Sequence, residues 1–208
     1  MKNLLVQVVL VLCINFSFVK AQTLLPEQKQ EAYQAAVDFQ LEMNLKFADS
    51  SQSPLNPEDL KQFTALNFFS IDTHHFVAKA RFERLEHEKP FAMKTTTQRL
   101  PEYKRFARLH FNIGGNKYQL YVYQNLDLVK MPQYKNYLFI PFTDLSNGFE
   151  TYGGGRYLDL EIPDTQEIIL NFNKAYNPYC AYNEKYSCPI PPKENHLNIA
   201  IQAGVMAF

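Results

Sequence analysis

The sequence predicts a mainly β fold, an antiparallel sandwich or barrel with an N-terminal helix packed on it. Near the N-terminus apolar residues recur every four positions, whereas from about residue 68 they alternate with polar residues. All seven glycines lie at or after Gly114, so the sharp turns belong to the second half of the chain. A leading helix followed by short-turned strands is typical of a closed antiparallel sheet with a covering helix.

The first predicted helix runs from Pro26 to Ala48. Pro26 suits the first helical position, and Glu27 complements the positive end of the helix dipole. We expect Asn56 to cap a second, short helix. The apolar stripe of the first helix consists of Tyr33, Val37, Leu41 and Leu45.

The clearest strand signal is a hairpin over residues 105–123. Alternate apolar residues share one face on each side, and Gly114 and Gly115 supply the turn. Pro141 indicates a bulge or an edge in a later, wholly apolar strand. The other predicted strands cover residues 76–85, 137–142, 156–162, 167–173 and 197–201.

The composition of the 208 residues, 46% hydrophobic and 20% charged with zero net charge, is that of a globular protein. The balance argues against a nucleic-acid partner, which would need a basic excess. Residues 1–21 are typical of a signal peptide, with Lys2, an apolar run and a small-residue cleavage site at Ala21. The alternative is a membrane anchor, although the run is short for a span of about 20 residues.

We therefore expect a protein exported to the periplasm or the extracellular space, with no transmembrane span in its mature chain. The predicted organisation is a signal peptide over 1–21 and one globular domain over 22–208. Within that domain, residues 22–66 are expected to be helical and residues 67–208 to be β-rich. The oligomeric state stays open.

Two cysteines, Cys180 and Cys188, remain after removal of the signal peptide. In an oxidising compartment such a pair indicates first a disulfide, here framed by Pro178 and Pro189. The alternatives are a zinc site with His196, whose spacing matches no compact motif, a cysteine nucleophile with His196 as base, and inert free thiols. No metal site and no cofactor is predicted.

A glycine run followed by arginine is the main candidate for a ligand site. The glycines can present several N–H groups to an anion, and Arg156 can clamp a carboxylate or phosphate. Strand parity places Arg156 on the interior face, where it needs a bound anion or an acidic partner such as Asp144 or Glu150. The alternatives are a wide hairpin connection with a solvated arginine and a purely structural ion pair.

Asparagines gather in the segment that follows the last long strand. They usually satisfy the backbone of turns, and they also line polar ligand sites. The predicted ligand-binding residues are Gly153, Gly154, Gly155, Arg156, Asn171, Asn173, Asn177 and Asn195.

Two long strings resemble the signature of a bacterial family, domain of unknown function 1684. They are FTDLSNGFETYGGGRYLD at 142–159 and FNKAYNPYCAYNEKYSCPIPPKEN at 172–195. The segments SPL at 53–55 and PFAMKT at 90–95 also resemble its exported, Bacteroidetes-type members. The resemblance spans nearly the whole mature chain and implies no activity.

The resemblance also bears on the cysteines and on the end of the chain. Related members without export signals keep the same cysteine pair, which favours ligand, metal or packing roles over a purely oxidative one. This chain departs from the family pattern at Phe149, often a basic residue, and at Val205 and Met206, which replace a Glu-Lys ending. A site that used those charges would be weakened or respecialised here.

Three functional hypotheses follow. The first is a binding or interaction module that holds a small anionic ligand where the glycine run, Arg156 and segment 171–195 converge. The alternative is a hydrolase-like enzyme in which Asp144, Glu150 or Glu194 acts as general acid or base and Arg156 stabilises developing charge. The third is a structural envelope protein with no small-molecule site, which an exposed apolar patch without a pocket would indicate.

Overall fold

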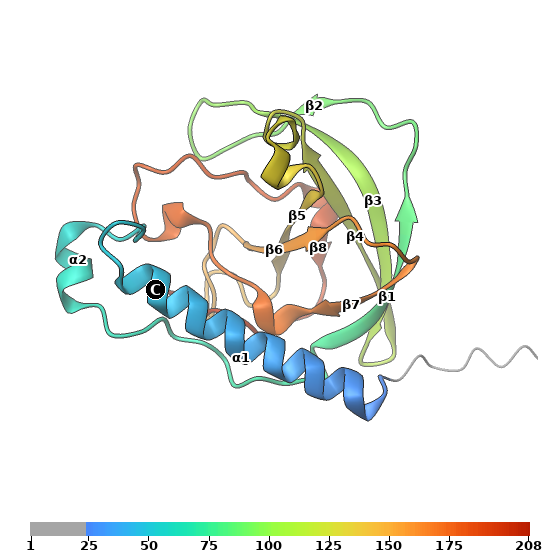
Figure 1. Cartoon of the computed structure of the whole chain (residues 1–208), viewed down its shortest axis with the longest axis horizontal. Helices are drawn as coiled ribbons and strands as arrows, with labels where there is room; N and C mark the ends of the chain where they lie inside the picture. Colours follow the sequence, from blue (N-terminus) through green and yellow to red (C-terminus); the bar gives the residue numbers. More distant parts are fainter. Residues whose placement is uncertain (1–23) are drawn as a thin grey trace, which may run out of the picture.

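The computed structural model describes residues 24–208, which form a curled β-sheet with a long helix lying across its open side (Figure 1). Helix α1 spans Pro26–Ala48 and helix α2 spans Pro57–Gln62. The strands are β1 (Val77–Arg84), β2 (Phe91–Ala92), β3 (Glu102–Ile113), β4 (Asn116–Asn125), β5 (Tyr137–Asp144), β6 (Arg156–Glu161), β7 (Glu167–Asn171) and β8 (His196–Leu197).

The sheet order is β6-β5-β4-β3-β1-β7, so β6 and β7 are the two edges of the curl. Strands β2 and β8 pair with β3 and β5 outside this path. All pairings of the ordered path are antiparallel, and only β8 runs parallel to its partner β5. The predicted fold class, a mainly antiparallel β protein with an N-terminal helix, is confirmed, and the barrel is an open half-barrel.

The local predictions agree with the structure at most elements. Gly114 and Gly115 have φ angles of 57° and 81°, as the tight turn between β3 and β4 requires. The side chain of Asn56 accepts hydrogen bonds from the N–H groups of Glu58 and Asp59 and so caps α2.

Two strand predictions are wrong in extent. The predicted strand 197–201 forms a ladder only over β8, and the predicted strand 167–173 ends at Asn171, where a 3₁₀ turn begins. In both places a side chain replaces the sheet ladder. Asp144 accepts a hydrogen bond from the Ile201 N–H, and Asn171 accepts one from the Asn173 N–H.

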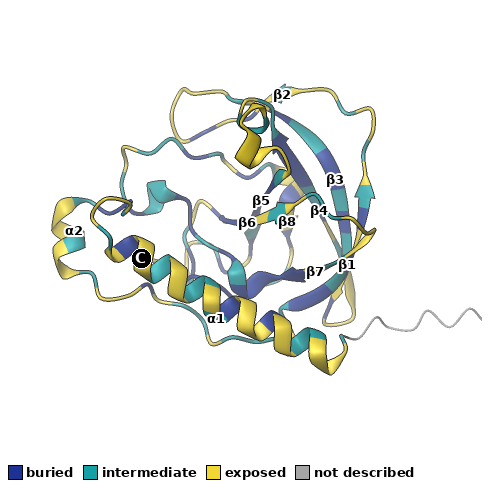
Figure 2. Ribbon diagram, viewed as in Figure 1, coloured by how far each residue is buried: buried dark blue, intermediate teal, exposed yellow. Residues whose placement is uncertain are grey.

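The main core lies inside the half-barrel, where one face of every long strand is buried (Figure 2). The C-terminal segment fills this interior with Leu197, Ile201 and Ala203, because β6 and β7 do not pair to close it. A separate aromatic cluster, with Tyr123 and Tyr157 at its centre, lies on the opposite face of β3–β6.

Helix α1 does pack on the half-barrel, but not through the stripe that the sequence indicated. Leu41 and Leu45 are 58% and 63% exposed, whereas Ala32, Ala36 and Phe47 are buried (Figure 2). A four-residue spacing advances about 40° around the helix at each step, so the stripe winds off any single face. The small alanines instead let α1 approach β7 and the following 3₁₀ turn closely.

Phe47 and the C-terminus belong to one small cluster at the end of α1. The C-terminus lies beside the last turn of the helix (Figure 1), and Phe47, Tyr182 and Val205 are buried together there. Within residues 24–208 neither helix combines the length and apolarity needed to cross a bilayer. The signal peptide predicted over 1–21 lies outside the described residues.

Substitutions on α1 distinguish the observed packing face from the predicted stripe. We expect Phe47→Ala to lower the free energy of unfolding by about 3–5 kcal/mol, because it empties a fully buried aromatic site. Leu45→Gln should change it by less than about 0.5 kcal/mol, since that side chain is mostly in solvent. Urea denaturation measures both values, and a larger loss for Leu45→Gln would contradict this packing.

Candidate functional site

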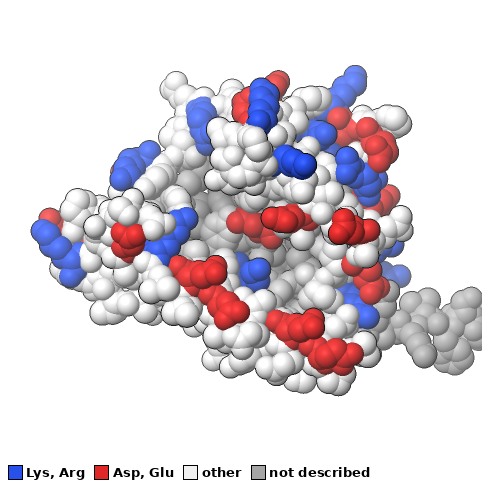
Figure 3. Space-filling model, viewed as in Figure 1, with Lys and Arg blue, Asp and Glu red and all other residues white. Residues whose placement is uncertain are grey.

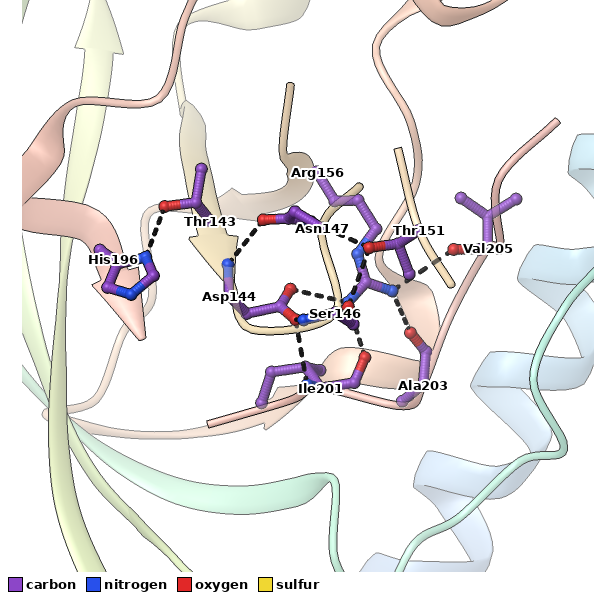
Figure 4. A network of polar contacts seen from close by, with 10 residues as sticks. All are labelled: Thr143, Asp144, Ser146, Asn147, Thr151, Arg156, His196, Ile201, Ala203 and Val205. Carbon is purple, nitrogen blue, oxygen red and sulfur yellow. Dashed lines mark hydrogen bonds and ion pairs between the residues drawn. The ribbon is translucent and has the colours of Figure 1, made fainter. Parts of the chain in front are cut away.

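The Arg156 guanidinium is wholly buried and binds parts of the protein itself (Figure 4). Its Nη2 donates to Asp144 Oδ2 at 2.9 Å and to the Ile201 carbonyl at 2.6 Å. Its Nη1 donates to the carbonyl oxygens of Ala203 and Val205. Burial lowers the pKa of Arg156, and the Asp144 carboxylate opposes that shift. The arginine thus joins β6, the end of β5 and the C-terminal segment.

Asp144 is fixed by the short loop that follows β5. Its Oδ1 accepts from the N–H and the hydroxyl of Ser146, and the Ser146 hydroxyl also contacts Thr151 (Figure 4). Of the predicted glycines, Gly155 has the backbone that requires glycine, with φ at 88° and a hypothetical Cβ only 2.5 Å from the Phe142 carbonyl. Asp144 is therefore the acidic partner of Arg156, and the two form the structural ion pair that the sequence analysis gave as an alternative.

The four predicted asparagines are buried and bond to backbone groups. Asn195 accepts from the Tyr121 N–H and donates to the carbonyls of Tyr121 and Pro141. It bridges β4 and β5 where Pro141 has no N–H for the ladder. The remaining three hold distant segments: Asn171 bonds Ala32, Asn173 bonds Asp72 and Asn177 bonds Met206.

The three carboxylates of the hydrolase hypothesis have three different sets of partners. Asp144 pairs with Arg156, Glu150 accepts from Gln202 at 2.8 Å, and Glu194 accepts from Arg105 at 2.7 Å. Burial alone would raise the pKa of Glu194, but the hydrogen bond from Arg105 lowers it. Glu194 therefore lacks the raised pKa that a general acid needs.

The disulfide predicted for Cys180 and Cys188 is not formed in this structure, where both cysteines are free. The sulfurs are nevertheless neighbours, since the Cys180 N–H donates to Cys188 Sγ at 3.2 Å. His196, the candidate third zinc ligand, instead forms a hydrogen bond with Thr143. Within residues 24–208 no three His, Cys, Asp or Glu side chains gather as a metal ion would need.

A cavity of about 260 Å³ opens where the two edges of the half-barrel face each other. Figure 3 shows this face hollowed between α1 and the sheet. The cavity is mostly apolar, and its polar groups come from Asp159, Asn171, Lys174 and Tyr176. The apolar walls are Ile140, Leu158 and Leu160 from β5 and β6, Ile168, Ile169 and Leu170 from β7, and Phe39 from α1.

Asp159 is the acidic group of this cavity. The hydroxyls of Tyr137 and Tyr176 each donate to its Oδ1 at 2.7 Å, and within residues 24–208 no protein donor bonds its Oδ2. The residue is exposed through the cavity, although its carboxyl lies among protein atoms deeply enough for desolvation to raise its pKa. The two hydroxyls oppose that shift and fix the carboxyl in place.

Lys174 is the basic group of the same cavity. It forms no ion pair within the described part of the chain, and its ammonium lies 5.9 Å from the centroid of the Phe39 ring. Its charge acts on Asp159 and favours the ionised carboxylate, but the two groups do not form a salt bridge. Opposite charges thus lie at the mouth of an apolar cavity and remain available to a ligand.

A second cavity of about 300 Å³ adjoins the first at Tyr176, which lines both. Its walls are the aromatic cluster of β3–β6 and the segment 176–189, including Cys188. A larger depression of about 830 Å³ lies beside residues 69–76, Glu150 and Gln202, but it is an open surface feature. The enclosed cavity with converging charges is therefore the better candidate site.

Sequence reasoning missed Asp159 and Lys174. Strand parity already separates Tyr157, Asp159 and Glu161 from the Arg156 face, and an acid two residues from a tyrosine on that face was the available signal. That signal becomes informative only once β6 is known to be an edge strand.

The fold and the cavity define the class of this protein: an open antiparallel half-barrel. An apolar cavity with charged groups at its mouth lies between its two edge strands. The chain belongs to the family described as "Protein of unknown function (DUF1684)", whose profile matches residues 61–206. This confirms the family resemblance seen in the sequence. Of the cavity residues named above, all but Phe39 lie inside the matched region.

A solved relative shares this architecture. It is the solution NMR structure of an uncharacterized protein from Haloarcula marismortui, 31% identical, with a TM-score of 0.68. The match covers 88% of this chain and 97% of that one. No curated protein matches the chain. The exported, Bacteroidetes-type assignment stays a prediction.

The Arg156 network allows a direct test of its structural weight. We expect Arg156→Ala to lower the free energy of unfolding by about 3–5 kcal/mol, because it leaves Asp144 buried without its partner. Arg81→Ala removes an arginine from an exposed pair with Glu83 and should cost less than about 1 kcal/mol. Urea denaturation compares the two, and equal losses would mean that the buried network is not stabilising.

The pH dependence of stability tests the environment of Asp159. Because its pKa is raised above the ordinary value of 3.8, the folded state binds this proton more tightly than the unfolded state does. Stability from this group is therefore greatest below about pH 4 and falls as the pH rises through the folded pKa. Relative to Asp159→Asn, the wild-type protein should lose free energy of unfolding over that range.

The matched control is Asp164→Asn, an exposed acid in the loop between β6 and β7. Its stability should follow the wild-type curve between about pH 3.5 and about pH 8, as measured by urea denaturation at each pH. A wild-type protein that gains stability over this range relative to Asp159→Asn would show a lowered pKa and contradict the assigned environment.

Proposed function

We propose that this protein is a binding protein for a small zwitterionic molecule with an apolar side chain, held in the cavity between β6 and β7. The observation that carries the proposal is the pair of opposite charges, Asp159 and Lys174, at the mouth of an apolar cavity without a salt bridge between them. An ammonium group would bond Asp159 Oδ2, and a carboxylate would bond the Lys174 ammonium.

The size and lining of the cavity support this class of ligand. A volume of about 260 Å³ is at the small end for ligand cavities and suits a molecule the size of an apolar amino acid. The apolar walls would take its side chain, while two fixed charges would set its orientation. Tyr137 and Tyr176 hold Asp159 in one position before a ligand arrives, which lowers the entropy cost of binding.

The proposal keeps the binding role inferred from the sequence and changes the site and the charge of the ligand. The earlier hypothesis placed a small anion at the glycine run and Arg156, but the observed donors of Arg156 are directed at Asp144 and three backbone carbonyls. No observation favours the hydrolase alternative over binding. Export to the periplasm or the extracellular space remains part of the proposal, and it rests on the sequence of residues 1–21.

Three probes of similar size separate the two charges. L-phenylalanine carries both charges, phenethylamine only the ammonium and 3-phenylpropionate only the carboxylate. We expect L-phenylalanine to bind most tightly by isothermal titration calorimetry. Asp159→Asn should weaken the binding of L-phenylalanine and phenethylamine by about tenfold or more and leave that of 3-phenylpropionate unchanged. Lys174→Gln should weaken the binding of L-phenylalanine and 3-phenylpropionate by a similar factor and leave that of phenethylamine unchanged.

The matched controls change the same charges elsewhere. Asp164→Asn and Lys135→Gln each remove one exposed charge outside the cavity and should leave all three affinities unchanged. Equal binding of 3-phenylpropionate and L-phenylalanine, with loss of both in Arg156→Lys, would instead support the anion site at Arg156. No binding of any probe would contradict the proposed ligand class.

A further inference from the structure

Cys180 and Cys188 lie side by side as free thiols but in unequal surroundings. Cys180 is in a 3₁₀ turn over Tyr179–Ala181 and is half-buried, whereas Cys188 is only 6% exposed. The Cys180 N–H donates to Cys188 Sγ at 3.2 Å, which fixes the buried sulfur next to the accessible one. Pro178 and Pro189 restrict the backbone at the two ends of this loop.

Cys188 is held by a second part of the chain. Its N–H donates to Thr96 Oγ1 at 3.1 Å, and its carbonyl accepts from the Thr96 N–H at 2.9 Å. The next residue, Pro189, pairs with Thr95 in an isolated bridge. The position of the buried sulfur is therefore set by the strand β2 region as well as by its own loop.

Hydrogen-bond donors surround the sulfur of Cys180. The Tyr152 hydroxyl lies 3.9 Å from Cys180 Sγ, and the thiol of Cys188 also bonds it. The Cys188 thiol contributes most, and together the donors lower the pKa of Cys180 to about 6. The same contact raises the pKa of Cys188. These shifts favour the thiolate on the more exposed Cys180 and the protonated thiol on the buried Cys188.

We propose that Cys180 and Cys188 form a redox-active pair that reduces disulfides, with Cys180 as the attacking thiolate and Cys188 as the resolving thiol. The accessible sulfur attacks one sulfur of a disulfide substrate, whose S–S bond breaks and releases one thiolate. Cys188 then loses its proton and attacks Cys180 Sγ, which forms the intramolecular disulfide and releases the second thiol. The protein pair loses two electrons, and the substrate disulfide becomes two thiols.

The asymmetry of the pair separates this activity from a structural disulfide. Donors that stabilise the Cys180 thiolate also make its sulfur a better leaving group, so this pair exchanges with disulfides faster than an ordinary structural one does. A resolving thiol that is buried beside the attacking sulfur meets the mixed disulfide without a large movement. This inference does not depend on the ligand proposed for the cavity between β6 and β7.

The expected reactivity can be set against an ordinary thiol. At pH about 5.5, a pKa of about 6 instead of 9.0 gives roughly 760-fold more thiolate. The lower basicity reduces the intrinsic nucleophilicity by roughly 25-fold, so the net gain in rate is about 30-fold. At pH 7 the expected gain in rate over an ordinary thiol is only about fourfold, so the experiment is done at the lower pH.

The test uses oxidised glutathione and the reduced protein without oxygen, followed by intact mass and peptide mapping. The wild-type protein should end as the Cys180–Cys188 disulfide, with release of two glutathione thiols per protein. Cys188→Ser, which keeps a hydroxyl donor beside Cys180, should accumulate one glutathione on Cys180. This should occur about 30-fold faster at pH about 5.5 than in the same variant unfolded in urea. Cys180→Ser should react no faster than its own unfolded form.

Tyr152→Phe tests whether the Tyr152 hydroxyl stabilises the Cys180 thiolate. Removing this donor should raise the pH midpoint of Cys180 alkylation by iodoacetamide, while the wild-type midpoint should lie near pH 6. The proposal is overturned if Cys180 in the folded Cys188→Ser variant reacts no faster than in the unfolded chain. It is also overturned if Cys188 is the residue that carries glutathione in the wild-type protein.

Discussion

The hydrogen bonds of the buried Arg156 guanidinium hold the C-terminal segment inside the half-barrel, and the rest of the fold depends on them. One planar group donates to Asp144 and to three carbonyls of residues 201–205, and thereby connects an edge strand to a segment more than forty residues later. Taking a guanidinium out of water is costly unless its donors are satisfied. The carbonyls bond its two terminal nitrogens only when Ile201 and Ala203 are already inside the half-barrel, so this interaction and the packing of the core depend on each other.

The open edge between β6 and β7 follows from the same arrangement. A sheet that curled fully would pair its two edges, but the C-terminal segment occupies the interior and Tyr176 pairs only with Tyr157 on the outside of β6. Beyond Tyr157, no strand of residues 24–208 lies beside the edge of β6, and Phe39 of α1 lines the cavity there. Natural proteins protect such edges with helices and charged side chains. Asp159 and Lys174 occupy this position, and the cavity is the space that remains.

The sequence contained enough information for the contacts that are local or depend on parity. Alternation predicted that Arg156 would face inward and need an acid, and Asp144 is that acid. The asparagine cluster could be read as turn-satisfying side chains because short amides bond nearby backbone, and Asn171, which accepts from the Asn173 N–H, is such a case.

The contacts that sequence patterns could not predict are those set by the sheet order. The stripe of α1 looked like a packing face, but the close approach of Ala32 to Asn171 decides which side of the helix is buried. Asp159 looked like one more solvated acid on a strand, and its role depends on β6 being an edge. The two thiols looked like a disulfide, since spacing shows proximity but not the donors that distinguish one sulfur from the other.

The cavity and the thiol pair share one segment of chain, and this has a thermodynamic consequence. Tyr176 bonds Asp159 at the cavity mouth, and the chain from Tyr176 leads directly through Pro178 to Cys180. Cys188 in turn lines the neighbouring cavity, beside the Pro189 carbonyl that accepts from the Tyr157 hydroxyl. If ligand binding and thiol oxidation each reposition this segment, the two equilibria are linked, and the effect of each on the other is equal in free energy.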